Sequence, residues 1–270
     1  MIRGVVGRLI GALYSMMNSI RWRYEAYCEK RKIAVGYGID KKFDGICLIL
    51  IPHSDDEWIG CSRILTNNKK VILCNMDMNG GDSESVHSLR FSEMKMAANC
   101  FKHDIITVKS DKDHALATLI NEIKPDFIFV PHYIDWHPEH IEVMKLLASS
   151  LENINTDRLK IVMYQVSCPI LYGITHALPM TKKEWKRKWM FFKEHYPSQL
   201  YISHQRFSLN EVINGKYINS FAAEVYCSVS PDSWLKLIND SIPNKERRDA
   251  LRQNLESISK MRDYISSVFV

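Results

Sequence analysis

The sequence predicts an α/β protein with a doubly wound, Rossmann-like and mostly parallel sheet. Short apolar segments, each the length of a buried strand, alternate along the chain with longer segments of helical periodicity. Two of the apolar segments, 45–51 and 127–130, run directly into histidines and acidic residues. Open α/β sheets carry their functional groups at the carboxyl ends of their strands, so both polar clusters are expected at one edge of the sheet.

The predicted elements follow one another in a regular order. The expected strands are 45–51, 71–75, 104–108, 127–130 and 160–165. The expected helices between them are 56–65, 85–101, 112–124 and 138–151. A common order for such a sheet, about 3-2-1-4-5, places the first and fourth strands side by side at the switch point of the topology. The two polar clusters would then meet there.

Added C-terminal strands and helices are predicted after residue 165, where the periodicity is mixed. A helix at 182–195 is expected to turn its tryptophans inward and its basic residues outward, namely Lys182, Lys183, Lys186 and Arg187. We interpret the basic face as solvent-exposed, with a substrate phosphate or an anionic surface as the alternative partner. Segment 221–226 is a further strand candidate, and 244–268 is predicted to be one terminal helix.

Residues 1–43 are predicted to lie outside the main domain, which spans 44–270. Segment 2–20 places apolar residues at helical spacing, with arginines and small polar residues on the other side. The pattern predicts an amphipathic helix over residues 1–24, followed by a basic linker at 30–44. This helix could pack on the domain or on a partner. It could instead lie on a membrane surface, since its basic and aromatic residues suit lipid headgroups.

The composition is ordinary for a soluble globular protein, with 46% hydrophobic and 25% charged residues. A net charge of +5 fits an anionic substrate or surface, and the absence of RNP, zinc-finger or basic-zipper motifs argues against a nucleic-acid partner. Seven scattered cysteines without a CxxC pair predict a reducing compartment. We expect a cytoplasmic protein, either free or peripheral at the inner face of the membrane, and leave open whether it forms a homo-oligomer.

The two polar clusters contain the donors of a metal site. His53 and Asp56 lie three residues apart across a predicted strand-to-helix turn. His140 lies in the first turn of the helix that Pro138 begins, and His137 shares its face. A catalytic zinc typically takes three ligands from histidine and acidic side chains and keeps one position for water. We therefore expect one metal site that joins the two strand ends.

The motifs resemble those of a known enzyme family. Segment Pro52-His-Ser-Asp-Asp-Glu57 resembles the (A/P)HPDDE signature of the LmbE/PIG-L-like de-N-acetylases, and His137-Pro-Glu-His140 resembles their HPDH signature. Shorter similarities are R-x-x-E at Arg90 and Glu93, S-Q at Ser198 and Gln199, and A-E at Ala223 and Glu224. The resemblance covers about residues 44–227. Ser54 replaces a common proline, and Glu139 replaces an aspartate.

The resemblance implies zinc-dependent hydrolysis of an N-acetyl group on an amino sugar, usually N-acetylglucosamine in a conjugate. It implies that His53, Asp56 and His140 bind Zn²⁺. Asp55 would be the general base that takes a proton from the zinc-bound water. His137 would stabilise the oxyanion as an imidazolium and protonate the departing amine.

Two further residues are predicted near the substrate. Arg90 is expected to bind substrate hydroxyls or phosphate, with pairing to Glu84 or Glu93 at the surface as the alternative. Asp135 is expected to orient His137 or to contact the sugar. The expected partner is an amino-sugar conjugate, linked to a nucleotide or a lipid. Two other functions remain open: a zinc amidase acting on a non-sugar or thiol-sugar amide, and a non-catalytic sugar-nucleotide-binding module.

Overall fold

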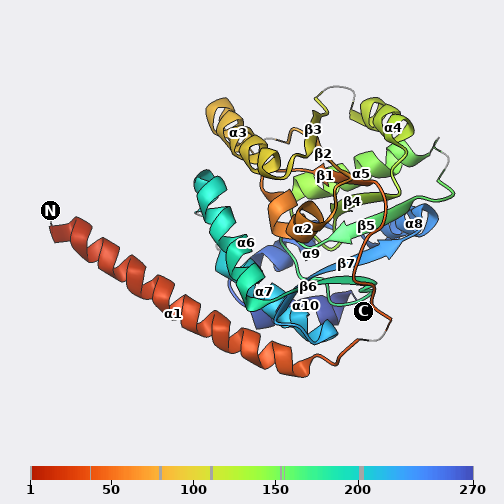
Figure 1. The fold of residues 1–270 in the computed structure, drawn as a ribbon. Helices are drawn as coiled ribbons and strands as arrows, with labels where there is room; N and C mark the ends of the chain where they lie inside the picture. The colour runs from red at the N-terminus through yellow and green to blue at the C-terminus, as the bar shows by residue number, and fades with distance from the viewer. Residues whose placement is uncertain are drawn as a thin grey trace.

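A seven-stranded sheet forms the centre of the protein (Figure 1). The computed structural model describes residues 2–36, 38–78, 81–109, 112–152, 154, 156–200 and 204–269, and only the backbone of residues 2–13. The strands are β1 (Cys47–Ile51), β2 (Val71–Asn75), β3 (Asp104–Thr107), β4 (Phe127–Pro131), β5 (Lys160–Tyr164), β6 (His176–Met180) and β7 (Ala222–Val229). Their order is β3-β2-β1-β4-β5-β7-β6, with β1 to β5 parallel and β7 antiparallel to both its neighbours. The predicted fold class and the order 3-2-1-4-5 are confirmed.

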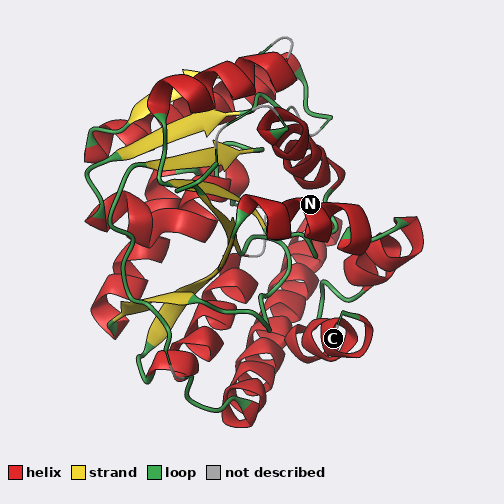
Figure 2. Ribbon diagram, turned by 90° about the vertical axis from the view of Figure 1, so that its right-hand side faces the viewer, coloured by secondary structure: helices red, strands yellow, loops and turns green. Residues whose placement is uncertain are grey.

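Helices cover both faces of the sheet (Figure 2). One face packs against α2 (Asp56–Asn67), α3 (Glu84–Phe101) and α6 (Lys182–His195). The other packs against α4 (Lys112–Ile123), α5 (Pro138–Leu151) and α8 (Pro231–Ser241). The remaining helices are α1 (Ile2–Lys32), α7 (His204–Asn214), α9 (Lys245–Gln253) and α10 (Ile258–Val268), with short 3-10 turns η1 (Pro197–Gln199) and η2 (Gly215–Ile218).

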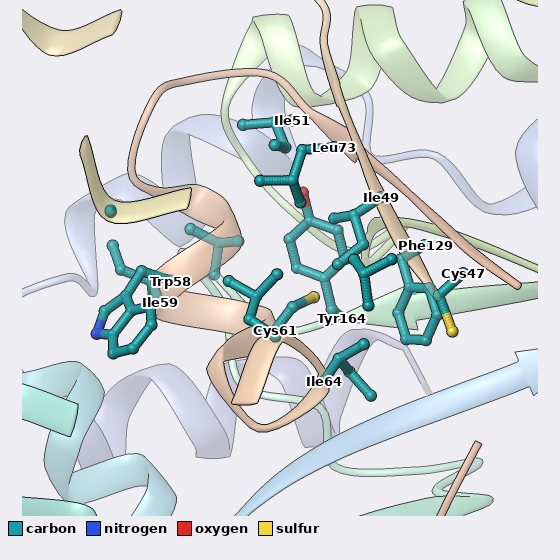
Figure 3. Close-up of a cluster of buried hydrophobic side chains, with 14 of the residues drawn as sticks. Cys47, Ile49, Ile51, Trp58, Ile59, Cys61, Ile64, Leu73, Phe129 and Tyr164 are labelled. Carbon is teal, nitrogen blue, oxygen red and sulfur yellow. The ribbon is translucent and has the colours of Figure 1, made fainter. Parts of the chain in front are cut away.

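The central strand β1 is buried on both faces, as an unbroken apolar run predicts. Its side chains alternate, so Cys47, Ile49 and Ile51 enter one core cluster while Leu48 and Leu50 enter the other. The first cluster also holds side chains from α2, β2, β4 and β5, among them Trp58, Ile59, Cys61, Ile64, Leu73, Phe129 and Tyr164 (Figure 3). This packing fixes α2 against the sheet and so places its first turn.

The N-terminal helix is longer than predicted. Helix α1 continues to Lys32, so residues 30–32 are helical rather than part of a linker. Its C-terminal half packs on α7 and α10, where Ala26 contacts a small buried cluster. The first part of the predicted apolar stripe, up to Leu13, lies outside the side chains that the structure describes. Beyond it, Met17 and Ile20 are each 60% exposed.

The prediction of a single C-terminal helix at 244–268 is wrong, because α9 and α10 are separate helices. Ser257 caps α10 by accepting a hydrogen bond from the Lys260 N–H (3.2 Å). The Glu25 carboxylate of α1 accepts another from the Ile258 N–H (2.7 Å). These two acceptors stabilise the start of a new helix at Ile258, whereas the apolar periodicity alone predicts one continuous helix. Among the described helices, none combines the length and apolar character that a bilayer crossing needs.

Candidate active site

The carboxyl ends of β1 and β4 lie next to each other, as the sequence predicts. The strands pair in parallel, with Cys47 opposite Phe127. His53 follows β1, and His140 occupies the first turn of α5 after β4. The two side chains meet, with Nδ1 of His53 lying 3.1 Å from Nε2 of His140. The sheet therefore joins the two polar clusters into one site.

Three donor atoms converge there: Nδ1 of His53, Oδ2 of Asp56 and Nε2 of His140. Their separations are 3.1 Å between the two nitrogens, 3.3 Å from His53 to Asp56 and 3.2 Å from His140 to Asp56. Ligand atoms ~2.0–2.1 Å from one tetrahedral ion lie about 3.3 Å apart, so the triangle has the dimensions of a metal site. His137 lies beside it, since donor atoms of the three histidines all fall within 4.8 Å of one another. These residues can hold a metal ion.

Carboxylates also contact the outer nitrogens of both histidines of the triangle. Oδ2 of Asp135 lies 3.0 Å from Nδ1 of His140, and Oε2 of Glu139 lies 2.5 Å from Nε2 of His53. Such partners fix the tautomer and orientation of metal-binding imidazoles. Asp135 also accepts a hydrogen bond from the His137 backbone N–H (2.9 Å). Asp135 is buried behind His140 and is not among the described residues that line the cavity. Its contact with the sugar therefore stays a prediction.

Asp55 and Asp56 are both buried but have opposite pKa shifts. Burial raises the pKa of Asp56, but His140 and His53 outweigh it and hold that pKa well below its usual range. Burial and the charge of Asp56 raise the pKa of Asp55 to about 7. Asp55 precedes α2 without a side-chain capping bond, and it lines the cavity. A carboxylate with a pKa near neutrality is suited to accept a proton.

The structure favours a neutral His137 over the predicted imidazolium. Burial, with the positive charges of His140 and His53, lowers the pKa of His137 to about 4. Its Nδ1 accepts a hydrogen bond from the Glu139 N–H (3.4 Å), which caps α5. The proton of the neutral ring therefore belongs on Nε2. His137 is then a hydrogen-bond donor in the cavity wall.

The site opens into a cavity of about 330 Å³. Arg90 lines it and forms an ion pair with Asp82, rather than with Glu84 or Glu93. Sequence reasoning missed Trp136 and Arg206 as wall residues, together with Val166, Ser167, Phe207 and Leu255. Arg206 lies in a stretch of mixed periodicity where no helix was expected, which left no signal to place it.

The shorter motifs also contact one another. Glu93 of α3 accepts hydrogen bonds from the backbone N–H (3.0 Å) and the hydroxyl (2.5 Å) of Ser198. This contact places the neighbouring Gln199 in the cavity wall, where its amide nitrogen is buried without a hydrogen-bond partner among the described residues. The R-x-x-E and S-Q segments thus form one supporting contact of the site.

A buried charge network lies under α2. Glu224 accepts hydrogen bonds from the Ser62 hydroxyl (2.5 Å) and from Nζ of Lys188 (2.6 Å). Lys188 also pairs with Glu211 and donates to the Ile59 carbonyl oxygen (2.7 Å). Lys188 follows the exposed Lys186 and Arg187 in sequence but is only 4% exposed, because its position, three residues after Trp185 and four before Phe192, lies on the inward face of α6.

The sequence matches no protein-family model and no curated protein sequence. Solved structures do match. One is N,N'-diacetylchitobiose deacetylase from Pyrococcus horikoshii, at a TM-score of 0.57 and 16% identity over 75% of this chain and 89% of the other. Another is the conserved protein TT1542 from Thermus thermophilus, at a TM-score of 0.56 and 17% identity over 70% of this chain and 96% of the other. The chain has the fold of a deacetylase.

The same fold also carries other chemistry. GalB, the 4-carboxy-2-hydroxymuconate hydratase from Pseudomonas putida, matches at a TM-score of 0.53 and 13% identity over 68% of this chain and 96% of the other. Folds host several functions, so the reaction must be argued from the site.

Proposed function

We propose that this protein is a zinc-dependent hydrolase that removes the N-acetyl group from an N-acetylated amino sugar. The observation that carries the proposal is the triangle of His53, Asp56 and His140 with a fourth group, Asp55, left beside it. Two imidazoles and one carboxylate suit zinc at a catalytic site, where three protein ligands leave a position open. A protein that only bound sugars would have no use for the additional buried carboxylate.

Each group of the site would have a separate role in the proposed reaction. Zinc in this site would polarise the acetyl carbonyl and make water more acidic. Asp55 is positioned to accept the proton of the attacking water, with its pKa already raised by burial. Nε2–H of His137 can donate to the carbonyl oxygen as it becomes negative, a role worth about 3–4 kcal/mol for one such donor. The proton held by Asp55 can pass to the amine, and acetate leaves.

The cavity supports a small, anionic conjugate as substrate. Its volume of about 330 Å³ is near the lower end of the roughly 300–1,000 Å³ range for small-molecule sites, which suits one sugar ring with part of its carrier. Arg90 and Arg206 both line it. Together with the net charge of +5, they favour an N-acetylhexosamine linked to a nucleotide or lipid phosphate.

The test is acetate release from free, nucleotide-linked and lipid-linked N-acetylglucosamine. Asp55→Asn should keep zinc and lose about 10²–10⁴-fold in rate, because it removes the base without removing a predicted ligand. Asp44→Asn, at an exposed position, is the matched control. Wild-type turnover by Asp55→Asn with zinc bound would contradict the role of Asp55. Absence of acetate release from every substrate would contradict deacetylation itself.

A further inference from the structure

A second hollow, of about 770 Å³, is lined by residues of α1, α6 and α7. Its described lining from α1 is Tyr14, Ser15, Asn18, Ser19, Trp22 and Arg23. On the other side are Trp185, Lys186, Trp189, Met190, Lys193, Leu200, His204, Gln205, Ser208 and Leu209. These side chains are aromatic, apolar, basic or neutral polar, and none of those described is acidic. We call this hollow the α1–α6 groove.

We infer that the α1–α6 groove is a docking surface for an anionic phospholipid membrane. Its basic side chains would contact the headgroup phosphates. The exposed apolar side chains beside them would enter the interface between headgroups and acyl chains. This surface extends the sequence-based expectation for residues 1–24, because α6 supplies much of it.

The charges of the groove are not compensated within the described part of the chain. Arg23, Lys186 and Lys193 have no acidic partner at ion-pair distance among the described residues. The other exposed basic residues of α6, Lys182, Lys183 and Arg187, extend the positive surface along the helix. Such a group is complementary to phosphate, and each basic residue near an anionic leaflet strengthens binding about fivefold.

The apolar side chains of this surface are unusually exposed. Tyr14 of α1 is 58% exposed, Met190 of α6 is 66% exposed, and Leu200 is 44% exposed. All three line the groove, and so does Trp22. Aromatic residues next to basic ones at an apolar rim are typical of interfacial membrane contacts. Exposure of several large apolar residues on one face indicates an interaction surface.

A second copy of the chain fits this surface less well than a membrane. In a twofold symmetric interface each patch meets the same patch of the partner. Lys186 and Lys193 would then approach their own copies, with no acidic residue in the described groove lining to offset the repulsion. A lipid surface supplies the missing negative charge.

The groove and the catalytic cavity share a wall. Gln199, Arg206 and Phe207 line the cavity, whereas their neighbours Leu200, Gln205 and Ser208 line the groove. One helix, about 10 Å across, therefore separates the two. A docked membrane would place lipid headgroups next to the cavity, which would favour a lipid-linked substrate if the proposed function holds. The docking surface itself does not depend on that function.

The experiment measures partitioning of the full-length chain onto vesicles of phosphatidylcholine, with or without phosphatidylglycerol, at low and high salt. The test variant is Lys186→Glu with Lys193→Glu. Its matched control is Lys145→Glu with Lys236→Glu, at exposed positions of α5 and α8 on the other face of the sheet. We expect binding to the phosphatidylglycerol vesicles that weakens with salt and falls at least about thirtyfold in the test variant alone.

Several results would overturn the inference. Equal binding to both kinds of vesicle, no binding to either, or equal loss in both double variants would exclude a specific anionic surface. Light scattering that shows a dimer dissociated by Met190→Glu would assign the surface to a second copy. Acetate release from a soluble substrate is measured in parallel, so failure of docking and failure of the proposed function are distinguishable.

Discussion

Replacement of Lys188 by methionine tests the buried charge network beneath α2. The ammonium group lies between Glu211 and Glu224 and donates to the Ile59 carbonyl. Methionine keeps a side chain of similar length and apolar burial but removes the positive charge. Two carboxylates are then left buried without their cation.

The loss of stability in Lys188→Met follows from the burial of Glu211 and Glu224. Removal of one partner from a buried ion pair costs about 3–5 kcal/mol, because the remaining charge stays desolvated. For a chain of this size each kcal/mol lowers the melting temperature by roughly 2–4 °C, so the total fall is roughly 6–20 °C. Lys186→Met, two residues earlier at an exposed position of α6, should change stability by less than about 0.5 kcal/mol.

The destabilisation caused by Lys188→Met should depend on pH. Burial raises the pKa of Glu211 to about 7 even with Lys188 beside it, and loss of the lysine should raise it further. The folded state then binds more protons than the unfolded state between the ordinary pKa of a glutamate and this raised value. Stability therefore falls as pH rises through that window. Lys188→Met should be less destabilised at pH 5 than at pH 8.

Thermal unfolding of wild type, Lys188→Met and Lys186→Met at both pH values checks the reasoning. We expect a large fall in melting temperature for Lys188→Met alone, and a larger fall at pH 8 than at pH 5. Equal melting temperatures for the two variants at pH 8 would refute the buried-pair argument. A loss independent of pH would refute the assignment of the cost to unpaired carboxylates.

Three other substitutions test the site and its support. His140→Ala should lose most of the bound zinc by elemental analysis while His114→Ala, at an exposed position, keeps it; equal zinc in both would remove His140 from the ligands. Glu139→Gln should weaken metal affinity about 10–100-fold in chelator competition, and no change would show that its contact with His53 is dispensable. Gly60→Ala should destabilise the fold by about 1–3 kcal/mol in thermal unfolding, because the added Cβ would collide with the Tyr164 ring; wild-type stability would mean that the ring moves aside at little cost.

The sequence predicted those parts of the fold that depend on local pattern. Each parallel strand is a short apolar run, and each following helix has apolar residues at regular spacing. The edge strand β6 was missed because Pro179 interrupts its pattern. Proline lacks an N–H donor and is tolerated at sheet edges, which is where β6 lies. Helix α7 was missed because its segment mixes polar and apolar residues without a clear stripe.

Contacts between distant segments could not be predicted in the same way. Helical spacing places Lys188 on the inward face of α6, but its partners Glu211 and Glu224 come from α7 and β7, and no local pattern identifies them. From the sequence alone, Glu139 is only a replacement of the aspartate in the HPDH signature. The structure shows that its carboxylate reaches His53 from the other polar cluster. Both roles depend on which elements face each other.

Strand register is the link between fold and chemistry in this protein. His53 and Asp56 follow β1, whereas His140 follows β4, so their separation depends on how the two strands pair. A slip of one residue would move one strand end by about 3.3 Å. That shift equals a full edge of the donor triangle, whose edges are 3.1–3.3 Å, and would also reverse the faces of the displaced strand. The pairing of β1 with β4 therefore determines the geometry of the donor triangle as directly as the ligand side chains do.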